Sequence, residues 1–376
     1  MEFSVYSWNI FLLAYCIFFE NSRMSKTIIC FYPTHQKRSN HFLFNLAKLL
    51  ESSGAFECWG YKDLQKERPR DLFKADIYHI NWFDQSVSFV SFLKRLCFLL
   101  TLNWKKKKIV WTVHNLVPHS KSPWYNAILR WLLLRFSAKI HIMSRATAEL
   151  SYLRKYKDKV IFIPHGDYFC SYPKSDLNVR ARYGIEGSKN IILFLGAVQP
   201  YKNVDVLISA YKKAFPTFKA PVLLICGKVE PESYGDELVE ISKGMENVIL
   251  DMKFVRDEDL SAYISSAEIL VAPYSYRSSL NSGTILLAFS YGKTVICPDI
   301  ACVKDIQEET DCLYSYHYES AEEHILRLSE IFKQINAAPE QNEMLKRKSQ
   351  LALEYMKKHS WESHRKEWLS LYGVSK

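Results

Sequence analysis

The sequence predicts an α/β protein with two Rossmann-like, doubly wound domains that face a central cleft. The chain has 376 residues, which is more than one hydrophobic core usually serves. From Met24 on, short apolar runs typical of buried strands alternate with segments that repeat apolar residues at helical spacing. This alternation stops at a polar segment from Tyr168 to Ser188 and then starts again. Strict alternation of strands and helices indicates parallel sheets covered by helices.

The expected elements of the first half follow from these runs in chain order. We expect strands at residues 27–33, 56–61, 75–83, 108–115, 139–144 and 160–166, and helices at 41–54, 86–104, 124–139 and 146–156. The first domain is therefore predicted to span residues 24–165. Its strand ends carry polar residues, which is where α/β sheets bind ligands.

The second half repeats the pattern. We expect strands at residues 190–198, 221–227, 247–251, 268–274 and 294–298, and helices at 203–215, 236–244, 257–267 and 283–291. The second domain is predicted to span residues 166–355, with ligand bound between the carboxyl-terminal edges of the two sheets.

Charge is unevenly distributed between the halves. Residues Met24 to His165 contain 24 Lys and Arg against 9 Asp and Glu, a net charge of about +15, and the rest of the chain after His165 carries about −4. No nucleic-acid-binding module accompanies the basic half, so a nucleic-acid partner is not expected. Nearly half of the residues are apolar, which excludes a disordered chain.

The nine cysteines are scattered and form no Cys-x-x-Cys pair. Several lie in strand-like apolar runs. We interpret them as reduced core cysteines of a cytoplasmic protein, because neither a disulfide framework nor a zinc site has this pattern.

Residues 1–23 form an N-terminal extension with an apolar run from Ile10 to Phe19. The run is too short to span a bilayer as a helix. It lacks a basic region before it and a cleavage site after it, so a secretory signal is not predicted. Because Met24 directly precedes a strand-like segment, we expect translation to start there. The alternative is a short helix that dips into a membrane.

The expected helix from about Gly283 to Tyr291 has an unusual start. Asn281, Ser282, Gly283 and Thr284 offer small side chains, hydroxyls and backbone N–H groups where the helix dipole is positive. Such a start binds phosphate in many proteins. The alternative is an ordinary N-cap, in which Ser or Thr satisfies the first-turn amides.

Several motifs together resemble the bacterial group-1, or family 4, glycosyltransferases. In the second half these are FLGAVQPYKN at 194–203, LLICGK at 223–228, DEDLSAYISSAEILVAPY at 257–274 and LLAFSYGKTVICPD at 286–299. In the first half, DIYHINWF at 76–83 and WTVHNLVPHS at 111–120 resemble the acceptor-domain signatures of a branch that builds exopolysaccharides. HSWESHRKEW at 359–368 resembles the closing helix of the family.

The resemblance implies the two-domain GT-B fold, with nucleotide sugar bound by the second domain. It also implies that residues 356–376 form a helix that crosses back to the first domain. The family places two glutamates at positions that correspond here to Ser279 and Leu287. Neither residue can supply a carboxylate, so Asn281, Ser282 and Thr284 are expected to carry more of the polar contacts to the donor.

Two further donor-site residues follow the first strand of the second half. Gly196 ends that strand, and Lys202 opens the next helix, where its ammonium can stabilise the negative charge that builds on a diphosphate leaving group. Gln199 stands where many relatives carry arginine, which removes a second cation. The alternative for Lys202 is a solvated helix-start lysine.

His114 is the expected catalytic residue, because it closes a buried strand at its carboxyl end and can act on the acceptor hydroxyl as a base. The following residues are expected to contact acceptor or to support His114. They are His35, Asn40, His79, Asn115, His119 and His165. For His79 the favoured interpretation is a core or supporting role, and Gly166 beside His165 is expected to act as a hinge.

No metal site and no cofactor are expected. The sequence Asp257-Glu258-Asp259 resembles a metal-binding Asp-x-Asp motif, but it opens an amphipathic helix, where acidic residues complement the helix dipole. The enzyme is therefore expected to be a metal-independent hexosyltransferase.

Two function classes remain open. The first is a glycosyltransferase that moves sugar from a UDP- or GDP-sugar to a lipid-linked or growing glycan in the synthesis of capsule, exopolysaccharide or lipopolysaccharide. The second is a non-catalytic GT-B protein that binds nucleotide sugar or polysaccharide as a regulatory subunit, which the missing glutamates favour.

We also expect the first domain to lie on the anionic inner face of the cytoplasmic membrane. Residues 86–104 carry apolar side chains and run into the lysines of 105–108. These side chains are Phe89, Phe92, Leu93, Leu96, Leu99 and Leu100. The next helix combines Arg130 and Arg135 with Trp124, Leu129, Trp131, Leu132 and Leu133. Interfacial helices have this composition. The alternative is that both helices bury their apolar residues against the sheet.

Overall fold

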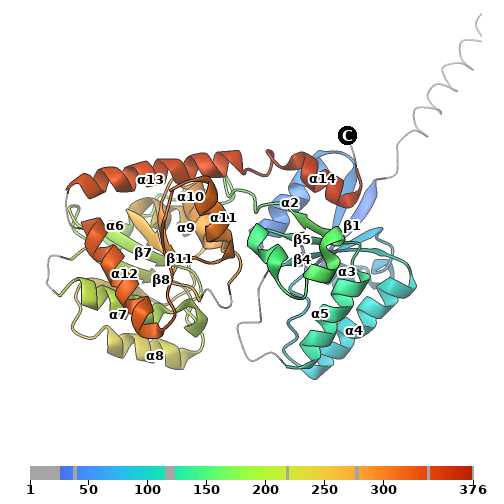
Figure 1. The fold of residues 1–376 in the computed structure, drawn as a ribbon, viewed down its shortest axis with the longest axis horizontal. Helices are drawn as coiled ribbons and strands as arrows, with labels where there is room; N and C mark the ends of the chain where they lie inside the picture. Colours follow the sequence, from blue (N-terminus) through green and yellow to red (C-terminus); the bar gives the residue numbers. More distant parts are fainter. Residues whose placement is uncertain are drawn as a thin grey trace, which may run out of the picture.

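The computed structural model describes residues 26–36, 40–114, 123–216, 220–275, 279–336 and 339–374. These residues form two α/β domains that lie side by side (Figure 1). Each domain is built on one six-stranded parallel sheet, with strand orders β2-β1-β3-β4-β5-β6 and β12-β11-β10-β7-β8-β9. The predicted α/β class with two doubly wound domains is confirmed.

The strands of the first domain are short and almost fully buried, as parallel strands covered on both faces must be. They are β1 (Thr27–Tyr32), β2 (Phe56–Gly60), β3 (Ile77–Asn81), β4 (Lys108–Val113), β5 (Lys139–Ile142) and β6 (Val160–Phe162). Its helices are α2 (His41–Ser52), α3 (Tyr61–Glu67), α4 (Phe89–Trp104) and α5 (Tyr125–Phe136), with the 3-10 helix η1 (Pro69–Asp71) between α3 and β3.

The second domain has the same architecture. Its strands are β7 (Ile191–Leu195), β8 (Val222–Cys226), β9 (Val248–Asp251), β10 (Ile269–Val271), β11 (Val295–Pro298) and β12 (Tyr314–Tyr316). Its helices are α6 (Val179–Tyr183), α7 (Val204–Ala214), α8 (Glu232–Ile241), α9 (Asp257–Ser266), α10 (Gly283–Ser290), α11 (Ala301–Glu309) and α12 (Ala321–Asn336), and the short 3-10 helix η4 (Pro200–Lys202) precedes α7.

The end of the chain returns to the first domain, as the GT-B resemblance implied. The long helix α13 (Pro339–Lys358) packs on α10, and α14 (Arg365–Tyr372) packs on α2 (Figure 1). The two helices are separated by a non-helical stretch at 359–364. Trp368, Leu371 and Tyr372 are buried in one hydrophobic cluster with residues of β1 and α2. The core of the first domain therefore includes residues from the far end of the chain.

The expected helix at residues 146–156 is wrong. The chain forms two 3-10 helices there, η2 (Arg145–Glu149) and η3 (Arg154–Lys159). Leu150 between them is extended, with ψ of 131°, and this break lets Leu153 become fully buried. Core packing of one leucine thus overrides the helical spacing of the segment. Similarly, the expected polar segment 168–188 contains α6.

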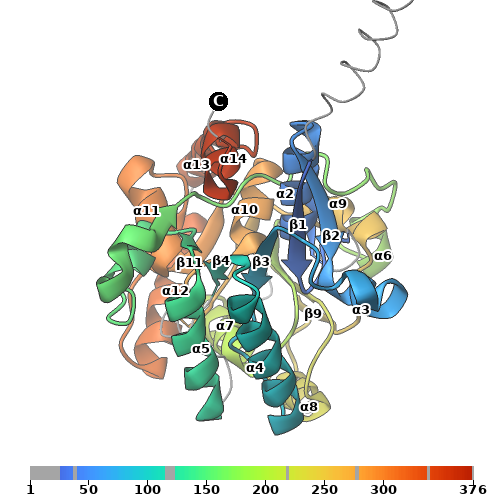
Figure 2. The same cartoon turned by 90° about the vertical axis from the view of Figure 1, so that its right-hand side faces the viewer.

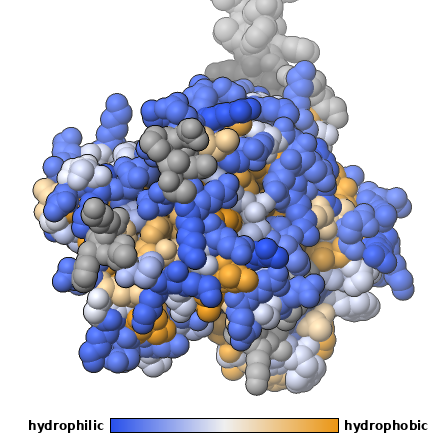
Figure 3. All heavy atoms as spheres, turned by 60° about the vertical axis from the view of Figure 1, so that its left-hand side comes forward, coloured by the Kyte–Doolittle hydropathy of each residue, from blue (hydrophilic) through white to orange (hydrophobic). Residues whose placement is uncertain are grey.

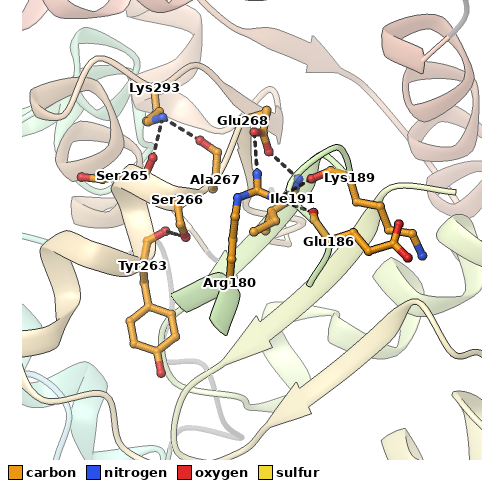
Figure 4. A network of polar contacts seen from close by, with 10 residues as sticks. All are labelled: Arg180, Glu186, Lys189, Ile191, Tyr263, Ser265, Ser266, Ala267, Glu268 and Lys293. Carbon is orange, nitrogen blue, oxygen red and sulfur yellow. Dashed lines mark hydrogen bonds and ion pairs between the residues drawn. The ribbon is translucent and has the colours of Figure 1, made fainter. Parts of the chain in front are cut away.

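A polar network ties this connecting segment to the amino-terminal edge of the second sheet (Figure 4). Arg180 of α6 pairs with Glu268 at 3.1 Å, and Glu268 also accepts a hydrogen bond from the backbone N–H of Ile191. Lys293 donates to the carbonyl oxygens of Ser265 and Ala267 at the end of α9. Polar side chains at this edge are thus paired with one another and with the backbone. The opposite edge carries the site.

Candidate functional site

Two glycines shape the carboxyl-terminal edge of the second sheet. Gly196 follows β7 with φ of 143°, and Gly227 follows β8 with φ of 146°. A Cβ atom on Gly227 would lie only 1.8 Å from the carbonyl oxygen of Gly196. Only glycine therefore fits at this position. Because the backbones of the two strand ends pack against each other at these glycines, the space beyond the sheet edge stays open for a ligand.

A hollow of about 340 Å³ lies at this edge. Its lining includes Gly196, Gln199, Lys228, Glu230 and Asp257, together with apolar side chains of which Phe254 is the most accessible, at 71% exposed. The volume falls in the range of small-molecule sites, and the mixture of an aromatic ring with a few polar groups is typical of them. A larger hollow of about 590 Å³ lies at the opposite edge against α13, away from these strand ends.

Lys202 ends the 3-10 helix η4 that follows β7. Its ammonium lies 3.5 Å from the centre of the Tyr274 ring, which follows β10. The neighbouring Asn203 has φ of 54° and donates a hydrogen bond to the carbonyl oxygen of Pro273. The ammonium is thus held by a cation–π contact at the same sheet edge as the hollow.

The start of α10 has the features of an N-cap. The hydroxyl of Ser282 accepts a hydrogen bond from the backbone N–H of Ile285 at 3.4 Å. Ser282 is 5% exposed and Thr284 is partly exposed. The side chain of Asn281 has both polar atoms buried without a hydrogen-bond partner. Buried amides are rarely left unpaired, so Asn281 is suited to a polar ligand group.

Gly283 faces a tyrosine from the hinge between the domains. A Cβ atom on Gly283 would lie 2.7 Å from the hydroxyl oxygen of Tyr168. Of the two positions that lack the family's glutamates, Ser279 is 5% exposed and its backbone N–H binds Ser275, and Leu287 is buried within α10. Leu287 is therefore a core residue.

His165 and Tyr168 form a fixed pair at this hinge. His165 donates from Nδ1 to the carbonyl oxygen of Gly166 at 2.6 Å, so its Nε2 accepts from the hydroxyl of Tyr168 at 3.2 Å. Burial lowers the pKa of His165 to about 4. His165 is neutral at physiological pH and lines the seam between the domains, where a space of only about 20 Å³ remains beside Asn281 and Ser282.

In the first domain, His114 follows β4 and is held by Asn81 at the end of β3. The amide nitrogen of Asn81 donates to the carbonyl oxygens of Tyr32 and His79, so its Oδ1 faces His114 Nε2 at 2.8 Å. His114 therefore donates from Nε2, and its Nδ1 keeps a free lone pair. Burial, followed by the neighbouring histidines His141, His79 and His165, lowers the pKa of His114 well below its ordinary value. A neutral imidazole of this kind can accept a proton.

His79 does not take part in this contact. It lies in a buried chain of hydrogen bonds in which the Tyr372 hydroxyl donates to His79 Nδ1 at 2.7 Å and His79 Nε2 donates to the Thr112 hydroxyl at 2.6 Å. Thr112 then donates to His141 Nδ1 at 3.0 Å, and His141 Nε2 donates to the carbonyl oxygen of Ile163 at 2.9 Å. The favoured expectation of a core or supporting role for His79 matches this geometry.

The other expected acceptor residues are placed differently. Asn40 caps α2, because its side chain accepts from the backbone N–H groups of Phe42 and Leu43. The ring of His35 packs beside Phe31, and its Nδ1 is buried without a partner. Asn115 and His119 lie outside the described residues. The cap explains Asn40 without a ligand.

Polar contacts join the two domains around the hinge. His41 Nε2 lies 3.2 Å from Asp257 Oδ2, and Asn45 donates to the hydroxyl of Ser171. The backbone N–H of Arg145 donates to Asp305 at 2.6 Å. Asp257, one of the two aspartates of the Asp-x-Asp sequence, is thus paired across the domains, and Asp259 pairs with Arg256 at 2.7 Å. Among the described residues no cluster of His, Cys, Asp and Glu has the form of a metal site.

Sequence reasoning missed Phe254, Tyr168 and Trp82, which packs on His114. Phe254 lies in a loop after β9, and only its exposure in the folded chain singles it out. Trp82 directly follows the expected strand-end residue Asn81, so its position in the INWF sequence was a usable signal. Gly227 was inside a quoted motif, and its strand-ending position matched that of Gly196.

Comparison with known proteins gives the family of the second domain. Residues 189–330 match the family model described as "Glycosyl transferases group 1". The second domain is a group 1 glycosyltransferase domain. The chain is also 25% identical over 277 residues to the GDP-mannose:glycolipid 4-beta-D-mannosyltransferase of Xanthomonas campestris pv. campestris. This alignment covers 71% of this chain and 74% of the relative. The expected enzyme class, a glycosyltransferase, is confirmed.

Solved structures support the fold of this glycosyltransferase. Anabaena Alr3699/HepE in complex with UDP superposes with a TM-score of 0.64 at 14% identity, over 93% of this chain and all of that one. The sucrose-phosphate synthase of Thermosynechococcus elongatus gives a TM-score of 0.68 at 14% identity, over 92% and 98% of the two chains. A glycosyltransferase of Rickettsia africae gives 0.62 at 16% identity, over 93% and 100%. The two-domain GT-B architecture therefore extends over both halves of the chain.

Proposed function

We propose that this glycosyltransferase moves a sugar from a nucleotide sugar to a lipid-linked or growing glycan acceptor in the synthesis of bacterial surface polysaccharide. The observation that carries the proposal is the hollow behind Gly196 and Gly227, which lies in the domain that matches the family and has the size and lining of a nucleotide site. The relatives named for transfer from GDP-mannose to a glycolipid support the two substrate classes.

The residues divide the chemistry between the domains. The nucleobase packs on Phe254 in the hollow, and the ammonium of Lys202 stabilises the diphosphate as its bond to the sugar breaks. His114 Nδ1 accepts the proton of the acceptor hydroxyl. We include metal-independent transfer in the proposal, because Asp257 contacts His41 Nε2 and Asp259 pairs with Arg256 at the start of α9.

We favour GDP over UDP as the nucleotide. The rim of the hollow carries the carboxylate of Glu230, which pairs with Lys228 at 2.5 Å. A carboxylate only accepts hydrogen bonds, and guanine offers adjacent N1–H and N2–H donors, whereas uracil offers one N–H. The name of the mannosyltransferase relatives points the same way.

Thermal unfolding with added nucleotides tests the donor site. A ligand at one hundred times its Kd stabilises a protein by about 2.7 kcal/mol, so GDP should raise the Tm measurably and more than UDP at equal concentration. Glu230→Gln should reduce the GDP shift and leave the UDP shift unchanged. Absence of any shift with GDP, UDP and their sugars would overturn the proposed donor site.

Transfer of radiolabelled sugar to membrane glycolipid separates the enzyme from the non-catalytic alternative. Binding without transfer would favour a regulatory subunit, which the serine and leucine at the glutamate positions would then explain.

We also propose that the first domain docks peripherally on the inner face of the cytoplasmic membrane, where a lipid-linked acceptor resides. Within the described residues no helix is long and apolar enough to cross a bilayer. Eight of the twelve exposed large apolar side chains of the described residues lie on or directly before α4 and α5. They are Val87, Phe89, Val90, Leu93, Leu100, Trp104, Trp124 and Trp131.

These side chains form a stripe on α4. Phe89, Leu93, Leu100 and Trp104 are spaced by four, seven and four residues, so they lie on one side of the helix. The opposite side buries Phe92, Phe98, Leu99 and Leu102 in the core. The sequence prediction had assigned Phe92 and Leu99 to the membrane face, and these two residues are core. The exposed stripe is the side of α4 that does not pack on the core.

The stripe on α4 has a neighbour on α5. Trp124 and Trp131 are seven residues apart, so both lie on one side of that helix, and α4 packs beside α5 on the outer side of the first domain (Figures 1 and 2). The face of the molecule turned forward in Figure 3 differs from the surface of α4 and α5. It is mostly hydrophilic, and its apolar residues lie in separate small groups.

Charge supports an anionic surface as the occupant. Neither α4 nor α5 contains an acidic residue. Lys94, Lys105, Lys106 and Arg135 are exposed beside the stripe. Lys108, expected among the membrane lysines, instead donates to the carbonyl oxygen of Tyr372. Four cations at about 1 kcal/mol each contribute roughly 4 kcal/mol near an anionic bilayer, which gives reversible binding.

Co-sedimentation with vesicles tests this surface. The protein should sediment with phosphatidylglycerol vesicles at low salt, bind phosphatidylcholine vesicles weakly, and dissociate as salt is added. Lys105→Gln with Lys106→Gln should weaken binding about tenfold or more, since each lysine contributes about 1 kcal/mol. Lys212→Gln with Lys213→Gln on the exposed side of α7 is the matched control. A wild-type protein that stays in the supernatant at low salt would refute the docking.

A further inference from the structure

The residue that packs on His114 has an unusual backbone. Trp82 directly follows β3 and has φ of 50°. A left-handed conformation is uncommon for a bulky side chain, and strained residues of this kind persist where the surrounding structure holds them. They are concentrated at functional sites. The conformation turns the chain sharply after Asn81, the residue that binds His114 from the same strand end.

Arg95 of α4 holds this turn. Its Nη1 donates to the carbonyl oxygens of both Trp82, at 3.2 Å, and Phe83, at 2.6 Å. The guanidinium lies against the rings of Tyr32 and Phe83, at 5.7 Å and 5.3 Å from their centres. Two consecutive carbonyl oxygens and two aromatic rings thus fix one side chain. Arginine offers the fork of donors that this contact needs.

The rest of the loop is held by α5. Arg130 pairs with Asp84 at 2.9 Å, with both side chains largely buried. Asn126 accepts from the backbone N–H of Ser86 at 3.0 Å and donates to the carbonyl oxygen of the same residue. Residues 82–86 are therefore tied to two helices and form a rigid support.

The support presents the Trp82 ring to His114. The two rings are stacked, with 4.0 Å between their centres and 19° between their planes. Phe42 meets the His114 ring edge-on at 5.8 Å, and Asn81 fixes Nε2. Trp82 covers one face of the imidazole and Asn81 binds Nε2. The ring is therefore held in one orientation, and the lone pair of Nδ1 points in one fixed direction.

We propose that Trp82 is a positioning residue for His114, and that Arg95 acts through Trp82 by holding its strained backbone. This inference rests on the proposed function, in which His114 is the base. In that step the proton of the acceptor hydroxyl moves to Nδ1, the acceptor oxygen forms a bond to the anomeric carbon, and the bond from that carbon to the diphosphate oxygen breaks with its electron pair leaving on the diphosphate. The Trp82 ring keeps Nδ1 aligned for the transfer and keeps water from one face of the ring.

The pH behaviour of His114 follows from its surroundings. The titratable groups near it are His79, His141 and His165, which come from β3, β5 and the hinge, and Arg95 supplies a fixed positive charge behind Trp82. Covering the ring with tryptophan favours the neutral form, because an imidazolium loses more hydration than the stacked ring returns. Replacing Trp82 by a smaller residue should admit water and raise the pKa of His114.

The test measures the titration of His114 and the kinetics in the full-length protein. Trp82→Leu should raise the His114 pKa, followed by NMR of histidine-labelled protein, by about one unit or more. It should lower kcat about tenfold with little change in donor KM and move the acid limb of the pH profile with the NMR value. Trp82→Phe should keep the His114 pKa and kcat close to their wild-type values. Arg95→Met should change the His114 pKa and kcat in the same direction as Trp82→Leu does.

The matched control is Trp59→Leu, which removes a tryptophan of β2 that lies under Arg68 at 4.9 Å. That variant should leave the His114 titration and kcat unchanged. An unchanged His114 pKa in Trp82→Leu and Arg95→Met would overturn the positioning role, as would a fall in kcat with an unmoved pH profile. Full activity of His114→Gln would instead refute the base in the proposed function, and the NMR titration would still decide whether Trp82 controls the ring.

Discussion

At the scale of single residues, the candidate site depends on groups held in place before any ligand arrives. Lys202 is fixed over the Tyr274 ring, His114 by Asn81, and the Gly227 backbone against Gly196. Groups fixed in advance need no reorganisation when charge develops on a leaving group, which is the main source of electrostatic catalysis. These residues are therefore held in advance, as the proposed sugar transfer requires.

Lys202→Ala should reduce sugar transfer by about 10² or more, in line with removal of a preorganised charge from a transition state. The measurement is kcat/KM with the nucleotide sugar, together with nucleotide affinity. Lys213→Ala, an exposed lysine on α7, should behave as wild type. Unchanged turnover and affinity in Lys202→Ala would show that the diphosphate binds elsewhere.

Strand-end residues were readable from the sequence, and loop residues were not. Gly196 and His114 stand directly after apolar runs, and Lys202 opens the next expected helix, so their place at a sheet edge follows from the pattern. Phe254 reaches the hollow only because the loop after β9 folds back, and Tyr168 reaches Gly283 across 115 residues of chain. Hydrophobic periodicity contains no information about such long-range contacts. For Asn40 the sequence suggested a ligand contact, and the helix cap accounts for it.

At the scale of elements, the start of α10 shows how a helix N-terminus can be both capped and kept accessible. Ser282 satisfies one amide, and Gly283 makes room for the hydroxyl of Tyr168. The sequence prediction treated this helix start as a phosphate site, with an ordinary N-cap as the alternative. The structure adds a second reason for glycine, because any side chain there would collide with the hinge.

A double-mutant cycle separates these two reasons. Gly283→Ala should destabilise the protein, since its Cβ would lie 2.7 Å from the Tyr168 hydroxyl, and overpacking of this kind costs about 1–3 kcal/mol. In the Tyr168→Phe background the cost of Gly283→Ala should be smaller, because the colliding oxygen is gone. Urea unfolding gives the stabilities and thermal shift with GDP gives the binding. Equal costs in both backgrounds would contradict the contact.

The elements themselves were predicted best where periodicity was strongest. The helices α2, α4, α5, α7 and α10 and all strands up to β11 lie within the expected segments or overlap them. Residues 146–156 failed because their short 3-10 helices follow the burial of Leu153. The elements α11, β12 and α12 had no specific expectation, since the resemblance pointed only to the closing helix.

At the scale of the whole molecule, buried neutral histidines link stability to pH. Burial lowers the pKa values of His141, His165 and His324 to about 4, and in the unfolded chain each returns to about 6.5. Between pH 6.5 and 4 the unfolded chain therefore binds protons at these histidines that the folded chain does not bind. Their contribution to stability is complete above pH 6.5 and is lost as pH falls toward 4.

Urea unfolding at pH 7.5, 6.0 and 5.0 should show this loss, with a slope of at most about 1.4 kcal/mol per pH unit for each histidine. His324→Gln should reduce the slope of the free energy of unfolding against pH by the contribution of one histidine, because His324 is buried against Tyr316 and Tyr318. Gln334→Asn, an uncharged and exposed position on the same helix α12, should leave the slope unchanged. A free energy of unfolding that is constant from pH 7.5 to 5.0 would contradict the buried neutral state.

The returning chain also determines the order in which the protein can complete its fold during synthesis. Asp167 binds the backbone and the indole N–H of Trp361, so the second domain leaves and re-enters the first domain at one place, like an insertion. Trp368, Leu371 and Tyr372 close the core of the first domain and leave the ribosome after the whole of the second domain. The domain that is synthesised first is thus finished second, after the inserted group 1 glycosyltransferase domain has had the whole of its own sequence in which to fold.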